Sequence, residues 1–414
     1  METIVDYLER EQRTFAELAF SPVDSLVLST LVYFNFDAAG VVERQSGARV
    51  LLHDVVSLTP IGPLTASSWL EDSPLTERFV QAVRASRRLR DVRVTFFVND
   101  NAPAIEKQFS AAAFVLPQGA TGFARFASVG EKSVSATTSA APCADERSEA
   151  GGDDLLYVAF RGTDGTLAGW KEDFNLTFKD VIPSQAAALR YLSGVASTCS
   201  CALAAGGHSK GGNLAQYAAL TCEKATYERL LAVYDHDGPS FFSDPSPRVG
   251  DASYQAMLHK TVPSSSVFGL MLERRQNYRI VESDALPFLS HAPFTWRVED
   301  GAFVYARELT RGSTAFDQSL NEWLHSVDTE RRELFIDTVY ELFMSTEAST
   351  WSEFQENLPK NIALMARRGG ALDADLRAFL LRTFARGVGI LTSTTARSIL
   401  PDPAKRVGLR QREG

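Results

Sequence analysis

Cysteine and long apolar runs are both scarce in this sequence. Its 414 residues include 4 cysteines, too few for the disulfide framework that stabilises small secreted proteins. No apolar run approaches the roughly 20 residues that a membrane-spanning helix needs. The opening stretch METIVDYLEREQ is acidic and lacks the apolar core of a signal peptide, so we expect a cytoplasmic location.

Excess positive charge is also missing from the chain as a whole. Its 42 Lys and Arg residues stand against 51 Asp and Glu residues, so we expect no nucleic-acid partner. The charge is unevenly spread, and residues 360–414 hold 11 Lys and Arg against 4 Asp and Glu. We expect a solvated helical face there, with peripheral contact to a membrane or a protein as the alternative. The sequence has no CxxC, HExxH, dinucleotide-binding or phosphate-loop motif, so we expect no metal and no cofactor.

The pattern of apolar residues favours an α/β fold. Short strand-like runs at 92–100, 122–129, 155–160 and 230–235 are joined by helical patterns, which indicates a mainly parallel sheet covered by helices on both faces. Residues 251–260 read as a helix, and Asp300-Gly301 reads as the turn of a hairpin. We predict one α/β domain over residues 1–315, with a mobile polar loop near 134–153. A helical C-terminal extension would occupy residues 316–414.

One short stretch carries a chemical signal. In GGHSKGG (206–212), Ser209 stands between a strand pattern and a helix pattern in a G-x-S-x-G arrangement. A nucleophilic serine on a sharp strand-to-helix turn needs small neighbours, since larger side chains would collide with the strand or the helix. The following helix would aim its first N–H groups at the site, so the backbone N–H of Lys210 could stabilise an oxyanion.

A second stretch, YVAFRGTDGTLAGWKEDFNLTF (157–178), lies upstream of the serine. Together the two stretches resemble the fungal-type, class 3 lipases of the α/β-hydrolase superfamily and a bacterial lipase-like branch with G-H-S-K-G-G. The resemblance covers about residues 155–300. It implies an α/β-hydrolase fold, Thr163 as the second oxyanion donor and residues 165–174 as a lid. Lys210 departs from the usual Leu, and we expect its side chain on the exposed first turn of the helix, with binding of an anionic head group as the alternative.

The base and the acid of a catalytic triad are less sharply indicated. Among six histidines we favour His291, because it follows a strand pattern at the rim where such a sheet gathers its loops. His325 and His236 are alternatives, His259 falls in the predicted helix 251–260, and His208 is expected to be structural. For the acid, Asp284 matches the lipase-like segment SDALPFL, whereas Asp237 follows the strand after the serine. Both remain open.

These features predict a serine hydrolase that cleaves carboxylic esters of lipid or small acyl type through an acyl-enzyme. Its substrate would be a small-molecule acyl ester or a lipid. The alternative is a catalytically silent hydrolase fold that serves as a binding or scaffold module through its basic helical tail.

Overall fold

A computed structural model gives the architecture of the chain. It describes residues 2–382 except 39–48, 67, 71–73, 118–119, 121–154, 165–166, 287–288, 316, 318–327, 347–356, 371, 373 and 379.

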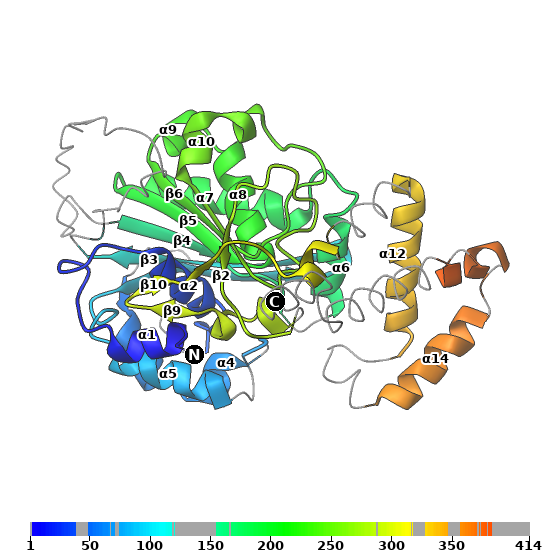
Figure 1. Ribbon diagram of the computed structural model, residues 1–414, viewed down its shortest axis with the longest axis horizontal. Helices are drawn as coiled ribbons and strands as arrows, with labels where there is room; N and C mark the ends of the chain where they lie inside the picture. Colours follow the sequence, from blue (N-terminus) through cyan, green and yellow to red (C-terminus); the bar gives the residue numbers. More distant parts are fainter. Residues whose placement is uncertain are drawn as a thin grey trace, which may run out of the picture.

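A large central sheet organises the fold (Figure 1). Within the described residues its nine strands follow the order β1-β2-β3-β4-β5-β6-β7-β8-β11. The bounds are β1 Val50–Leu51, β2 Arg93–Ala102, β3 Lys107–Leu116, β4 Leu155–Phe160, β5 Ala202–His208, β6 Leu230–His236, β7 Leu258–Pro263, β8 Arg279–Val281 and β11 Tyr305–Ala306. Strands β4 to β8 pair in parallel, whereas β1 to β4 and the β8–β11 pair are antiparallel. The predicted α/β fold with a mainly parallel sheet is confirmed.

Helices cover both faces of this sheet. Figure 1 shows α7 and α8 on one face, and α1, α2, α4 and α5 on the other. The helix bounds are α1 Ile4–Arg10, α2 Pro22–Leu31, α3 Leu52–Leu58, α4 Ile61–Thr65, α5 Pro74–Ala85, α6 Leu167–Asn175, α7 Pro183–Thr198, α8 Lys210–Thr221, α9 Lys224–Tyr227, α10 Ala252–Met257, α12 Thr329–Met344 and α14 Leu358–Gly370. The sheet therefore has no face left open to water at its centre, as its apolar strands require.

Strand β4 shows how the sequence produces this layering. All six residues of LLYVAF are buried. Tyr157 belongs to the apolar core that includes α1, α2 and α5, whereas its neighbour Val158 belongs to the core under α7 and α8. Because successive side chains of a strand point to opposite faces, an unbroken apolar run fits only a strand that is covered on both sides.

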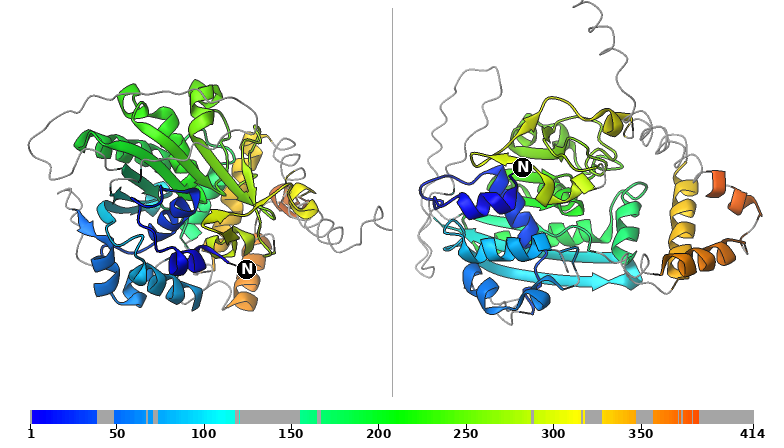
Figure 2. Two further views of the ribbon diagram at one scale, coloured as in Figure 1. Left: turned by 60° about the vertical axis from the view of Figure 1, so that its left-hand side comes forward. Right: turned by 60° about the horizontal axis from the view of Figure 1, so that its bottom comes forward.

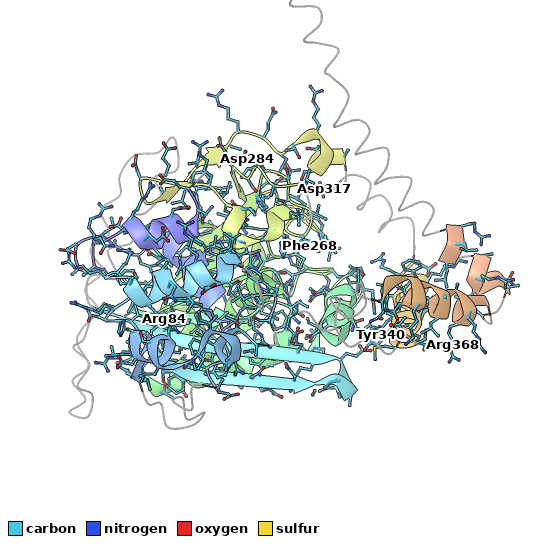
Figure 3. All side chains as sticks on the ribbon, turned by 90° about the horizontal axis from the view of Figure 1, so that it is seen from below. Arg84, Phe268, Asp284, Asp317, Tyr340 and Arg368 are labelled. Atoms are coloured by element: carbon cyan, nitrogen blue, oxygen red, sulfur yellow. The ribbon has the colours of Figure 1, made fainter. Side chains whose placement is uncertain are left out.

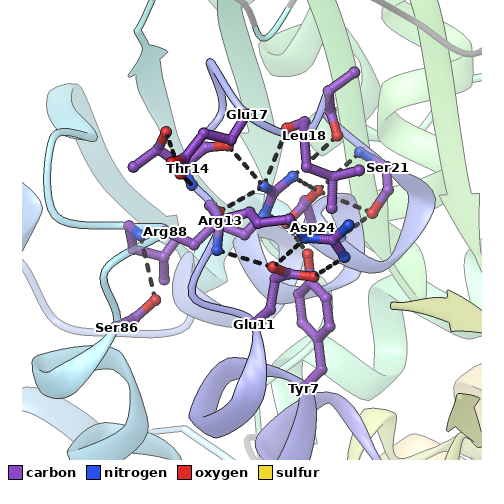
Figure 4. A network of polar contacts seen from close by, with 12 residues as sticks. Tyr7, Glu11, Arg13, Thr14, Glu17, Leu18, Ser21, Asp24, Ser86 and Arg88 are labelled. Carbon is purple, nitrogen blue, oxygen red and sulfur yellow. Dashed lines mark hydrogen bonds and ion pairs between the residues drawn. The ribbon is translucent and has the colours of Figure 1, made fainter. Parts of the chain in front are cut away.

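The N-terminal helices are held by a buried ion pair (Figure 4). Arg88 donates through Nε and Nη2 to the two carboxylate oxygens of Asp24, at 2.6 and 2.7 Å. Tyr7 donates its hydroxyl to the same carboxylate at 2.8 Å. Asp24 also closes the capping box of α2 with Ser21, so one carboxylate joins the start of α2 to α1 and to the segment after α5.

The expected hairpin and one expected helix have different outcomes. Strands β9 (Val298–Glu299) and β10 (Ala302–Phe303) pair across Asp300 and Gly301, which both have positive φ as a tight hairpin turn requires. The helix expected over 251–260 is wrong in its last three residues. It ends at Met257, and β7 begins at Leu258 beside β6, so pairing to the sheet overrides the local helical pattern.

Some expectations fall on residues that the structure does not describe. The strand expected at 122–129 and the loop near 134–153 lie outside the described residues. Strand β3 was not anticipated by the pattern. It is a buried antiparallel neighbour of β4.

Two helices, α12 and α14, lie in the described part of the chain after residue 315. Helix α12 lies beside α6 at the side of the molecule, and α14 packs against α12 (Figures 1 and 2). None of the helices in the described ranges combines the length and apolar character needed to cross a bilayer.

Candidate active site

Ser209 sits on a strained turn between β5 and α8. Its backbone has φ 60° and ψ −134°, a conformation that a non-glycine residue adopts only when its surroundings enforce it. Its N–H donates to the carbonyl of His236 at 2.9 Å, and its own carbonyl accepts from Gly212 N–H at 2.9 Å. The turn is therefore fixed from the neighbouring strand and from the first turn of α8.

The glycines around Ser209 are required by close backbone approach. A Cβ on Gly207 would collide with the backbone of Gly211, and a Cβ on Gly211 would collide with the carbonyl oxygen of Phe160 at the end of β4. Strand β4, strand β5 and helix α8 thus approach so closely that no side chain larger than that of glycine fits between them. This packing places the segment after Phe160 beside the serine.

Thr163 lies in that segment and faces the same cavity as Ser209. Its hydroxyl donates to Asp173 Oδ2 on α6. One oxygen of Asp173 is fully covered, and desolvation raises the pKa of this carboxyl group to about 6, although the nearby Lys210 acts in the opposite direction. The lid expected at 165–174 falls largely on α6, and its first two residues, 165–166, lie outside the described part of the chain.

Lys210 is the first residue of α8, so its backbone N–H is at the helix N-terminus beside Ser209. The expectation of an exposed side chain is wrong, because its ammonium group is fully buried and lies 2.9 Å from Glu172 Oε2. The ammonium group of Lys210 is already paired with Glu172 inside the protein. Nothing therefore supports a role for it in binding the anionic head group of a substrate.

His291 and Asp237 are brought together by the fold. The imidazole Nδ1 of His291 lies 2.6 Å from Asp237 Oδ2, so it donates to this carboxylate. Asp237 is fully buried at the end of β6 with a positive φ of 57°. Its other oxygen accepts from Ser266 Oγ at 2.5 Å and from Gly269 N–H at 3.1 Å. The carboxylate is held in one orientation, as the orienting acid of a triad must be.

Asp284 is not brought to His291. It is exposed on the loop after β8 (Figure 3). The ring of Phe268 packs against the His291 ring, with 4.4 Å between the ring centroids. Of the two candidate acids, Asp237 is the one in contact with an imidazole.

The other histidines occupy different surroundings. His208 is buried and donates Nε2–H to the carbonyl of His291 at 2.7 Å, and burial holds its pKa well below the usual range. His236 is fully buried, bonded to Ser25 and Thr261, and burial lowers its pKa to about 3. His259 lies in β7, and its ring stacks on Tyr234 at 4.8 Å. His325 lies outside the described residues.

A cavity of about 370 Å³ opens at Ser209 and His291. Its polar wall includes Thr163 and Lys210 beside these two residues, and its remaining wall is mostly apolar, with Trp69, Phe174, Phe268, Met271, Leu289 and Pro293. A larger cavity of about 660 Å³ lies elsewhere, lined by residues such as Phe20, Met257 and Phe303. The smaller cavity is the one that a strained serine and a carboxylate-bound imidazole both line.

Sequence reasoning did not single out three groups that support this site. Ser266 and Gly269 hold Asp237 from the loop after β7, and Glu172 binds the ammonium of Lys210. The three successive charged residues Lys171-Glu172-Asp173, in the stretch just after Thr163, are the sequence feature that could have pointed to Glu172. In the described part of the chain, no group of three or more His, Cys, Asp or Glu side chains could hold a metal ion.

No curated protein and no solved structure matches the chain. Residues 83–341, well over half of the chain, match the Mbeg1-like family. This match includes β4, the Ser209 turn, α6 and the Asp237–His291 pair. The chain therefore belongs to the Mbeg1-like family, which is a lipase-like family.

Proposed function

We propose that this protein is a serine hydrolase that cleaves carboxylic esters through an acyl-enzyme. The observation that carries the proposal is that Ser209, at φ 60°, and the Asp237-bound imidazole of His291 line one cavity. A strained, half-buried serine that lines a cavity with an oriented base is the arrangement that nucleophilic catalysis requires. The lipase-like family supports the hydrolase class.

In the first step, Ser209 Oγ attacks the ester carbonyl while His291 Nε2 takes its proton. Asp237 keeps the other nitrogen of His291 protonated and stabilises the imidazolium that forms. The backbone N–H groups of Lys210 and Thr163 donate hydrogen bonds to the former carbonyl oxygen and stabilise its negative charge. Collapse of this intermediate releases the alcohol with the proton from His291 and leaves the acyl group on Ser209.

In the second step, His291 takes a proton from water, and the resulting hydroxide attacks the acyl-enzyme. The carboxylic acid leaves and Ser209 regains its proton. The apolar wall of the cavity supports an acyl chain as the group bound beside Ser209, since a polar group there would lose hydrogen bonds to water.

The direct test is labelling of the purified protein with a fluorophosphonate, which reacts with activated serines. We expect labelling of the wild type, loss in Ser209→Ala and His291→Ala, and retention in His325→Ala. Ser253→Ala, at an exposed serine, is the matched control and should label like the wild type.

Absence of labelling in the folded wild type, with and without detergent micelles, would contradict the proposal and favour the binding or scaffold module. Equal loss in His325→Ala and Ser209→Ala, with labelling kept in His291→Ala, would instead assign the base to His325.

A further inference from the structure

Helix α6 carries three charged residues in succession, and each one binds a different part of the molecule. Lys171 pairs with Asp337 on α12, Glu172 pairs with Lys210 at the start of α8, and Asp173 accepts the hydroxyl of Thr163. Two of these three contacts lead to the residues whose backbone N–H groups line the proposed oxyanion hole. One helix therefore contacts both of these residues through its side chains.

The Glu172–Lys210 pair is entirely enclosed. Both side chains have no solvent exposure, and Oε2 of Glu172 lies 2.9 Å from Nζ of Lys210. Lys210 also donates to the backbone carbonyl and the side-chain oxygen of Gln108, at 3.3 and 3.2 Å.

Glu172 is equally saturated. It accepts from Ser184 N–H at 2.9 Å, from Ser184 Oγ at 2.8 Å and from Gln108 N–H at 3.1 Å. A buried pair gains little net stability over apolar packing, because both ions lose their hydration. Its full set of hydrogen bonds instead fixes one geometry. That geometry ties α6 to β3, to α7 and to the residue that follows the serine.

Asp173 completes the arrangement on the cavity side. It accepts from Thr163 Oγ1 through Oδ2, and its Oδ1 lies 3.7 Å from Lys210 Nζ. The side chains of Thr163 and Lys210 thus converge on neighbouring carboxylates of the same helix. Both residues line the cavity that contains Ser209.

We propose that Glu172 and the side chain of Lys210 are positioning residues. They hold the backbone of the proposed oxyanion hole, at Thr163 and Lys210, in a fixed place relative to α6. The inference rests on the proposed function and adds residues to it. In this arrangement the ammonium of Lys210 does not touch the substrate. It acts through the first turn of α8 and, by way of Asp173, through Thr163.

The test compares four proteins with the wild type. Lys210→Met and Glu172→Gln each leave one half of the pair without its partner, and the double variant replaces both charges by neutral groups of similar size. Arg88→Met is the matched control, because it breaks the buried pair with Asp24, which lies among the N-terminal helices. Thermal unfolding shows how far each variant is destabilised.

The first readout is steady-state hydrolysis of a short soluble p-nitrophenyl ester at a temperature where all variants are folded. Each single variant should lower kcat about 10–100-fold with KM changed less than about threefold, since displaced donors weaken the transition state more than the bound ester. The double variant should recover at least about tenfold of that loss, because no uncompensated charge remains. Arg88→Met should lose thermal stability without this loss of kcat.

The second readout does not depend on activity. Amide hydrogen exchange of residues 161–175 should be faster in Lys210→Met and Glu172→Gln than in the wild type, and unchanged in Arg88→Met. Unaltered exchange and unaltered kcat in folded single variants would overturn the inference. If the wild type shows no hydrolysis and no fluorophosphonate labelling, the proposed function fails, and unaltered exchange at 161–175 would then refute the positioning role on its own.

Discussion

His291 Nδ1 donates to Asp237 Oδ2 at 2.6 Å, although 54 positions separate the two residues. Asp237 stands directly after β6, whereas His291 ends a short helical turn that follows β8. Two parallel strands, β7 and β8, lie between them in the chain. The contact therefore exists only because parallel strands deliver their following loops to the same edge of the sheet.

This contact makes Asp237 the residue to test as the acid. Asp237→Asn should lower kcat/KM roughly 10³–10⁴-fold, because the amide no longer holds the required tautomer of His291. Ester hydrolysis and fluorophosphonate labelling measure the effect. Asp284→Asn, at the exposed alternative, should stay close to the wild type. A loss confined to Asp284→Asn would reverse this assignment.

The packing of the Ser209 turn predicts a sharp contrast between two glycines. Gly211→Ala should destabilise the protein by about 1–3 kcal/mol, because its methyl group collides with the Phe160 carbonyl. Gly194→Ala should stabilise it by about 0.5–1 kcal/mol, since Gly194 lies inside α7 with open space at the Cβ position. Urea denaturation of both variants provides the comparison. Similar effects of the two changes would show that β4 and α8 are not so closely packed.

The burial of His236 leads us to expect that the free energy of unfolding depends on pH. Its pKa is lowered to about 3 by burial, so it stays neutral in the folded protein, while in the unfolded chain it takes up a proton below about pH 6.5. The unfolded state then binds more protons, and the free energy of unfolding should fall as pH drops from about 6.5 toward 3.

The expected slope is about 1.4 kcal/mol per pH unit for this one proton. Urea midpoints of the wild type and His236→Gln between pH 7 and 4 measure it, and the variant should show a shallower slope. Parallel curves for the two proteins would contradict this expectation, because they would mean that His236 takes up its proton in the folded protein at the same pH as in the unfolded chain.

The contact between α6 and α12 predicts that the C-terminal extension supports the site region. Lys171 is buried, whereas its partner Asp337 is about half exposed (48 %), and Tyr340 of the same helix lies beside this ammonium (Figure 3). Asp337→Asn should cost about 1 kcal/mol of stability, since solvent screens one side of the pair.

Urea denaturation measures this cost. Glu333→Gln, an exposed residue of α12, removes the same charge and should cost little. Equal losses in both variants would indicate a general charge effect and not the pair with Lys171.

The sequence alone was sufficient for the features that depend on local pattern. Ser209 between small residues at a strand-to-helix junction requires a tight turn, since only glycine permits the close approach of β4, β5 and α8. The unbroken apolar run of β4 requires cover on both faces. Asp300-Gly301 fits a hairpin turn because both residues tolerate positive φ.

Tertiary structure decided what depends on partners distant in the chain. Both Asp237 and Asp284 follow strands, and only the loops after β7 and β8 determine that Asp237 meets His291. Lys210 looks like a surface residue in sequence, yet Glu172 on another helix allows its charge to be buried. A buried charge is tolerated only with a matching partner, and such a partner is supplied by the fold rather than by neighbouring residues.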